Sequence, residues 1–143
     1  RRQVMVESAA IERGAPFIPD TAAKLLDVAF KVSNNDARAL HVMIRGQMLT
    51  LDWAAQEMRF AGGVPLKMVS GRETVLLPAG NVLSVRVLVD RTSVEVFLNG
   101  GEVAASYCYL PDAYEHPVVI RGWDGSQTVS EFELHELESI WSQ

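Results

Sequence analysis

The 143-residue sequence predicts an all-β fold, a sandwich or barrel of short antiparallel strands. Two observations lead to this prediction. Apolar and polar residues alternate with a period of two in the main hydrophobic segments, as in strands that place one face on a core. Clusters of Gly, Asn, Asp and Pro separate these segments and mark turns. With 48% hydrophobic residues, the chain is predicted to form a single domain, residues 1–143, with a sizeable core.

The alternation is clearest in five segments, taken in chain order. They are residues 26–32, 40–44, 83–89, 94–98 and 132–134. Turn signals fall between or beside them at residues 33–36, 62–63, 78–81, 99–101 and 123–126. One short helix competes with this pattern, from Thr21 to Leu26, with Asp20 as its N-cap. Because that helix would run directly into a strand pattern, strands dominate the prediction.

The segment 83–101 is predicted to be a β-hairpin followed by a second turn at residues 99–101. We expect Arg91 and Thr92 to form its two-residue corner. Val89 then faces Val94, and the valines that alternate on either side of this pair form an apolar ladder toward the core.

Glu95 lies on the outward face of this hairpin and has two interpretations. It is diagonal to Arg86, where a surface salt bridge would contribute ~0.2–1 kcal/mol. Alternatively, its carboxylate is available to the hydroxyl groups of a sugar that lies on the open face of the sheet.

Composition and charge exclude several classes of protein. Lys and Arg number 13 against 18 for Asp and Glu, and no dense basic run occurs, so we expect neither nucleic acid nor an anionic membrane as a partner. No run of 18 apolar residues occurs, so no membrane-spanning helix is predicted. Cys108 is the only cysteine, which excludes an internal disulfide and leaves the compartment open.

Four stretches together resemble the C-terminal β-sandwich of glycoside hydrolase family 32, which contains invertases, levanases and inulinases. They are residues 25–30 (LLDVAF), 75–78 (VLLP), 89–97 (VDRTSVEVF) and 134–141 (LHELESIW). The resemblance implies a two-layer antiparallel β-sandwich, concanavalin A-like as in the legume lectins, with residues 25–30 as its opening strand. It also implies that the sandwich follows a five-bladed propeller that is absent from this chain.

In that family the propeller holds the catalytic carboxylates. The nucleophile lies in an Asn-Asp-Pro motif, the acid/base in Glu-Cys and a stabilising Asp in Arg-Asp-Pro. In this sequence Asp36 is followed by Ala37, and Cys108 is preceded by Tyr107, so these motifs are missing. We therefore assign no catalytic residue and expect the chain alone to be inactive. The start at Arg1, without an initiator Met, is expected for a fragment of a longer protein.

Sugar binding needs an aromatic surface for the C–H face of a ring and polar groups for its hydroxyls. Two segments combine such residues, 51–53 and 121–125. The predicted carbohydrate-contacting residues are Asp52, Trp53, Glu95, Arg121, Trp123 and Asp124. For both tryptophans the alternative is packing in the core or at a sheet edge, and Trp141 is predicted to anchor the last strand.

The three histidines, His41, His116 and His135, lack the spacing of metal ligands, so no metal or cofactor is predicted. We expect a non-catalytic domain that supports the catalytic propeller of the same polypeptide and helps to hold fructan. Two alternatives stay open: a self-standing fructan-binding module, and a purely structural or oligomerisation domain. In the last case the face that a propeller would cover is exposed and mediates self-association. The sequence leaves open whether sucrose, levan or inulin is the substrate.

Overall fold

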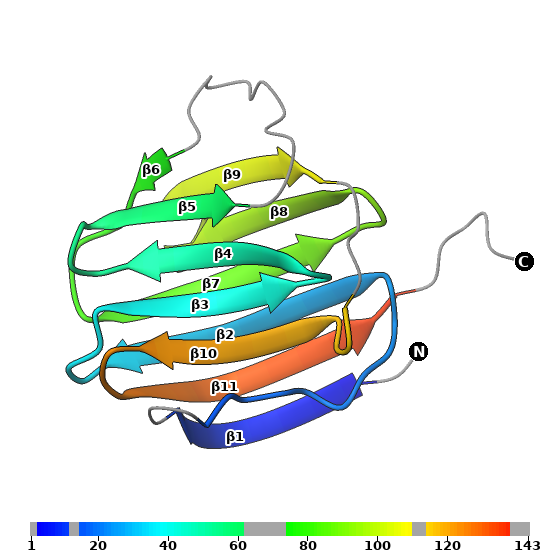
Figure 1. The fold of residues 1–143 in the computed structure, drawn as a ribbon, viewed down its shortest axis with the longest axis horizontal. Helices are drawn as coiled ribbons and strands as arrows, with labels where there is room; N and C mark the ends of the chain where they lie inside the picture. Colours follow the sequence, from blue (N-terminus) through cyan, green and yellow to red (C-terminus); the bar gives the residue numbers. More distant parts are fainter. Residues whose placement is uncertain (1–2, 12–14, 62–73, 110–113, 138–143) are drawn as a thin grey trace, which may run out of the picture.

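The computed structural model describes residues 3–11, 15–61, 74–109 and 114–137 (Figure 1). In chain order the elements are β1 (Gln3–Ile11), β2 (Leu26–Asn34), β3 (Ala39–Ile44), β4 (Gln47–Asp52), β5 (Glu57–Ala61), β6 (Thr74–Leu76), β7 (Val82–Val89), β8 (Ser93–Leu98), the 3-10 turn η1 (Asn99–Gly101), β9 (Val103–Cys108), β10 (Val118–Trp123) and β11 (Gln127–Glu136). Among these residues, no helix is long and apolar enough to cross a membrane. The turn signal at residues 62–63 and Trp141 lie outside the described residues.

The strands form two antiparallel sheets, which confirms the predicted two-layer β-sandwich. One sheet has six strands in the order β1-β11-β2-β7-β8-β9, and the other has five in the order β10-β3-β4-β5-β6. The two sheets overlie one another in the view of Figure 1. In β2, β7 and β8, buried positions alternate with more exposed ones. The period of two predicted for these strands therefore places one face of each strand on the core.

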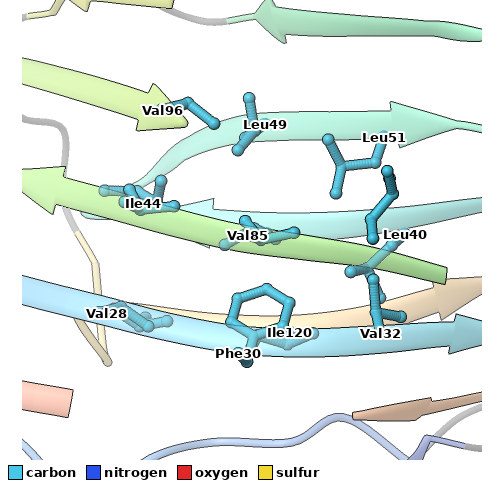
Figure 2. Close-up of a cluster of buried hydrophobic side chains, with 14 of the residues drawn as sticks. Val28, Phe30, Val32, Leu40, Ile44, Leu49, Leu51, Val85, Val96 and Ile120 are labelled. Carbon is cyan, nitrogen blue, oxygen red and sulfur yellow. The ribbon is translucent and has the colours of Figure 1, made fainter. Parts of the chain in front are cut away.

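The core lies between the inner faces of the sheets. Figure 2 shows Phe30 and Val85 of the six-stranded sheet opposite Leu49 and Ile120 of the five-stranded sheet. All four side chains are buried. Phe132 of β11 adds a second aromatic layer, because its ring meets Phe30 at 6.1 Å and Phe17 at 4.9 Å.

The predicted hairpin register is confirmed in full. Val89 pairs with Val94 and Val87 with Val96, and the corner is closed by the Asp90 N–H, which donates to the carbonyl of Ser93 at 2.9 Å. The turn at 99–101 is also confirmed as η1, where Asn99 has a φ of 50° and Gly100 of 70°.

The expected ion pair between Arg86 and Glu95 is wrong. The Arg86 guanidinium instead donates to both carboxylate oxygens of Asp27, from Nε at 3.0 Å and from Nη2 at 2.8 Å. Asp27 lies on β2, the neighbour of β7 in the sheet. The bidentate geometry that a guanidinium forms with a carboxylate favours this partner over a diagonal one on β8, and Glu95 stays exposed beside Ser106.

Two predictions about the start of the domain are also corrected. The short helix from Thr21 to Leu26 does not form. The Thr21 hydroxyl instead accepts a hydrogen bond from the Ala23 N–H and donates to Glu136, and Leu26 begins β2. The opening strand is β1 rather than residues 25–30, and β1 pairs with β11 at the edge of the six-stranded sheet.

Arg45 connects the corner of the signature hairpin to the other sheet, and Tyr109, which follows β9, binds the same corner. Arg45 occupies the two-residue turn between β3 and β4, where it and Gly46 both have positive φ. Its Nη1 donates to the Arg91 carbonyl at 2.7 Å and to the Asp90 carbonyl at 3.3 Å. The Tyr109 hydroxyl donates to the same Asp90 carbonyl at 2.8 Å. The hydrogen bonds to the backbone carbonyls of this corner therefore stabilise the fold.

A β-bulge interrupts the pairing of β11 with β2. Ser130 pairs with Lys31 and Glu133 with Ala29, so β11 carries one more residue than β2 between these pairs. The bulge contains Glu131, whose φ of 50° is left-handed. Because it shifts the alternation by one residue, Val129 before it and Phe132 after it both face the core.

Candidate carbohydrate-binding surface

Three of the predicted site residues, Arg121, Trp123 and Asp124, are exposed on or directly after β10 of the five-stranded sheet. The register places Trp123 of β10 beside Ala39 of β3, and Ala39 beside Asp52 of β4. In the next row, Arg121 lies beside His41. Two segments that are distant in the sequence, 51–53 and 121–125, therefore meet at one end of this sheet.

Arg38 connects the two segments through its backbone. Its N–H donates to the Trp123 carbonyl at 2.9 Å, and its own carbonyl accepts from the Trp53 N–H at 2.9 Å. The Arg38 guanidinium also lies over the Trp123 ring, 4.4 Å from its centroid, in a cation–π contact. This residue was not among the predicted site residues.

Trp123 is the accessible aromatic group of this surface. It is 38% exposed, and the His41 ring lies 5.2 Å from it. Burial, together with the positive charge of Arg59, lowers the pKa of His41, so its imidazole is neutral at pH 7. A neutral imidazole can both donate to and accept from a hydroxyl group. Arg121 and Asp124 are exposed beside these rings, and Asp124 follows β10 with a φ of 58°.

Asp52 and Trp53 lie in the same region but are buried. Asp52 is 1% exposed, and its carboxylate accepts hydrogen bonds from the Ala55 N–H at 2.9 Å and from Arg59 at 3.0 Å. Trp53 is 7% exposed and packs in the core. Trp53 therefore packs in the core, which is the alternative to sugar contact that the sequence left open for it. Neither the Asp52 nor the Trp53 side chain is accessible to a ligand in this structure. Glu95 is exposed but lies on the other sheet, on β8.

The Asp52 carboxylate stabilises the turn after β4. Burial alone would raise its pKa, but the hydrogen bonds from Ala55 and Arg59 outweigh burial and lower the pKa below the usual value of 3.8. Its charged form is therefore favoured by folding. This stabilisation is fully present above the pKa of the unfolded chain and is lost as the pH falls through the lower pKa of the folded protein.

We expect Asp52→Asn to lower the free energy of unfolding by about 1–3 kcal/mol at pH 7, because the half-buried Arg59 guanidinium and the Ala55 N–H lose a charged acceptor. The difference from the wild type should narrow as the pH falls toward 3. Urea unfolding at pH 7, 5 and 3 measures it. Glu57→Gln is the control, because Glu57 binds the same Arg59 from a more exposed position. A difference that stays constant with pH would contradict this assignment.

Asp36 is a second carboxylate that is bound within the protein. The Asp36 carboxylate accepts hydrogen bonds from the backbone N–H and the hydroxyl of Ser126, which lower its pKa. No group of three or more His, Cys, Asp or Glu residues that could hold a metal occurs in the described part of the chain.

Taken together, these features define an antiparallel β-sandwich domain of the lectin-like type with a mixed aromatic and polar patch on one sheet. The sequence matches the family described as "Glycosyl hydrolases family 32 C terminal" over residues 3–136. The chain therefore belongs to glycosyl hydrolase family 32 and corresponds to its C-terminal domain, as the four stretches predicted.

Four similar curated proteins are named levanase or sucrose-6-phosphate hydrolase. A levanase from Bacillus sp. (strain L7) is 37% identical over 71 residues, which cover 50% of this chain and 8% of that protein. A sucrose-6-phosphate hydrolase from Escherichia coli is 25% identical over 113 residues, 78% of this chain and 24% of that protein. The matches to curated relatives thus cover no more than about a quarter of those relatives.

Solved structures share the fold over nearly the whole chain. Exo-inulinase from Aspergillus awamori has a TM-score of 0.69 at 18% identity and is covered over 29% of its length. Fructan 1-exohydrolase IIa from Cichorium intybus has a TM-score of 0.71 at 12% identity and is covered over 36%. The match covers 98% and 97% of this chain, respectively.

Proposed function

We propose that this chain is the non-catalytic C-terminal domain of a β-fructosidase. In this proposal it supports the catalytic propeller domain that precedes it in the same polypeptide, and it contacts fructan through the surface formed by Arg38, His41, Arg121, Trp123 and Asp124. The observation that carries the proposal is the role of the family signature in the fold. Val89, Val94 and Val96 of the signature are buried in the core, and the backbone carbonyls at its hairpin corner accept hydrogen bonds from Arg45 and Tyr109.

The state of the carboxyl groups supports a non-catalytic role. Retaining glycoside hydrolysis needs a nucleophile and an acid/base residue about 5–5.5 Å apart, and the acid must have a raised pKa. The carboxyl groups of Asp36 and Asp52 have displaced pKa values, and both are lowered. Both groups are also occupied by hydrogen bonds from the protein itself. They suit the stabilisation of turns.

The fraction of each relative's length that this chain matches supports the proposal that a catalytic domain precedes it in the same polypeptide. The chain spans 29% and 36% of two structural neighbours named as an inulinase and an exohydrolase, so most of each neighbour lies outside the match. A domain that occupies the C-terminal third of such enzymes can act as a support for the remainder. The fructoside substrates named for the relatives make fructan the first ligand to test.

The experiment is a hydrolysis assay and a calorimetric titration of the purified chain. We expect no release of reducing sugar from sucrose, levan or inulin, with a family 32 levanase as positive control. We expect weak binding of levan or inulin at millimolar concentration, lost in Trp123→Ala and retained in Thr92→Ala on the distant hairpin corner. Turnover by the purified chain would overturn the non-catalytic role. Absence of heat would remove fructan binding and leave the supporting role.

A further inference from the structure

A hollow lies on the outer face of the six-stranded sheet, which is the sheet that does not carry Trp123. It has a volume of about 410 Å³ and is formed by β2, β7, β8, β11 and η1. A single water occupies about 30 Å³ of liquid, so the hollow has room for a ligand of several heavy atoms. We call it the Phe97 hollow, after the phenyl ring in its wall.

The hollow exists because four neighbouring positions carry small residues. Ala29 of β2 and Ser84 of β7 lie in its floor, and Gly100 and Gly101 of η1 form its rim. A Cβ atom added at either glycine would meet nothing within 4 Å, so the rim is open. The Ser84 N–H donates to the Asn99 side chain at 2.9 Å, which fixes η1 above the sheet.

Phe97 gives the hollow an apolar wall. It belongs to β8, where its neighbours Val96 and Leu98 face the core, so Phe97 points outward and is only half-buried. A phenyl ring held at the edge of an empty hollow on a sheet surface offers a flat face to the C–H groups of a sugar. The core does not account for this aromatic residue of the signature.

Two ion pairs balance the charges of the residues that line the hollow. Arg86 is held in a bidentate pair with Asp27 that uses Nε and Nη2, so Nη1 is left to donate to a ligand. Lys31 Nζ lies 2.9 Å from Glu131 Oε2, and both residues line the hollow. Since each cation already has its anion, these groups suit the hydroxyl groups of a neutral ligand better than a phosphate or a carboxylate.

The β-bulge places Glu131 at this position. Glu131 has a left-handed φ of 50°, a conformation that non-glycine residues seldom adopt. Bulges commonly redirect a side chain beside a binding site, and such backbone strain persists where its surroundings enforce it. Here the bulge brings the Glu131 carboxylate to the rim and to Lys31.

We propose that the Phe97 hollow binds a neutral sugar ring with adjacent hydroxyl groups. The C–H face of the ring packs on Phe97, Arg86 Nη1 donates to one hydroxyl, and Glu131 accepts from another. The naming of this sugar as a fructosyl unit of fructan rests on the proposed function. This site is separate from the Trp123 surface, so the domain would hold two parts of one polysaccharide.

The test is an amide-resolved NMR titration of the ¹⁵N-labelled 143-residue chain with short inulin oligosaccharides and with levan. We expect shifts at Ser84, Phe97 and Gly100. Phe97→Ala and Ala29→Tyr, the latter filling the floor from the outward face, should each weaken this binding at least about tenfold, whereas Ser106→Ala on β9 should leave it unchanged. Binding should be insensitive to salt, and fructose 6-phosphate should bind no more tightly than fructose.

The outcomes separate the two proposals. Shifts confined to Trp123 and Arg121, with full affinity in Phe97→Ala, would overturn the hollow as a site while fructan binding stands. Shifts at the hollow with another neutral sugar, such as a glucan oligosaccharide, but none with fructans would support the hollow and overturn fructan as its ligand. No shift at the hollow with any of these sugars would overturn the proposal, and the hydrolysis assay would still decide the non-catalytic role.

Discussion

Phe132→Ala is expected to lower the free energy of unfolding by about 3–5 kcal/mol. The Phe132 side chain is 1% exposed, and its ring contacts Phe17 edge-on and Phe30 in a stacked arrangement. Truncation removes both aromatic contacts and leaves a cavity between β11 and the loop that carries Phe17. Because domains of this size are stable by only about 5–15 kcal/mol, the variant should unfold at clearly lower urea concentration. Equilibrium urea unfolding followed by far-UV circular dichroism measures the difference.

Two matched variants isolate the contribution of the core. Phe132→Leu keeps most of the volume and should cost less than about 1.5 kcal/mol beyond the lost aromatic contacts. Phe97→Ala makes the same chemical change on the outer face of the same six-stranded sheet, where the ring is only half-buried. It should lower the free energy of unfolding clearly less than Phe132→Ala. Equal losses from Phe97→Ala and Phe132→Ala would contradict the assignment of Phe132 to the core.

Arg45→Met is expected to lower the free energy of unfolding by about 2–4 kcal/mol, because hydrogen bonds to a charged donor contribute about 1.5–3 kcal/mol each and their loss leaves acceptors unpaired. Arg45 is 6% exposed and donates to the carbonyls of Asp90 and Arg91. Without it, the Asp90 carbonyl keeps the hydrogen bond from the Tyr109 hydroxyl, and the Arg91 carbonyl loses the bond from Arg45. Thermal and urea unfolding of the variant give the magnitude.

Control variants of Arg45 must separate the loss of the guanidinium hydrogen bonds from the effect of the substitution on the backbone conformation of the turn. Arg45 has a φ of 47° and precedes Gly46 with a φ of 86°, a geometry that asparagine tolerates better than most residues. Arg45→Asn should therefore recover a few tenths of a kcal/mol relative to Arg45→Met but remain less stable than the wild type. A double-mutant cycle with Tyr109→Phe should show coupling, since both side chains bind the Asp90 carbonyl. Wild-type stability in both Arg45 variants would refute the contribution of this contact.

The hairpin could be predicted to the residue because a two-residue loop fixes which positions face each other. Once Arg91 and Thr92 form the corner, the pairing of Val89 with Val94 follows without knowledge of the rest of the fold. The partner of Arg86 could not be predicted in this way. Asp27 reaches it only because β2 lies next to β7, and a sequence pattern does not determine which distant strand becomes a neighbour.

Three of the strands that the prediction missed, β1, β9 and β10, lack a clear alternation of apolar and polar residues. β9 is built mostly from small residues, and β10 begins with three consecutive apolar residues, Val118 to Ile120, so neither has a period of two. β1 lies at the edge of its sheet, where exposure of one side weakens the pattern.

The candidate sugar surface was predicted only in part. Arg121, Trp123 and Asp124 lie on it, because a loop rich in aromatic and charged residues is a local signal. Arg38 and His41 were missed, since their contacts to Trp123 depend on the pairing of β3 with β10. The depth of burial of Trp53 could not be predicted from its neighbours in the sequence, which are equally compatible with a surface position.

The position of β11 has a consequence for how the protein is made. The last strand of the described chain lies between the first two strands, pairing with β1 on one side and β2 on the other. During translation, β1 and β2 are synthesised long before the strand that joins them has left the ribosome. The six-stranded sheet can therefore close only near the end of synthesis, and a domain that precedes it on the same polypeptide would have time to fold first. A nascent chain that stops before β11 would leave two strand edges unpaired, which favours aggregation and degradation over a partly folded product.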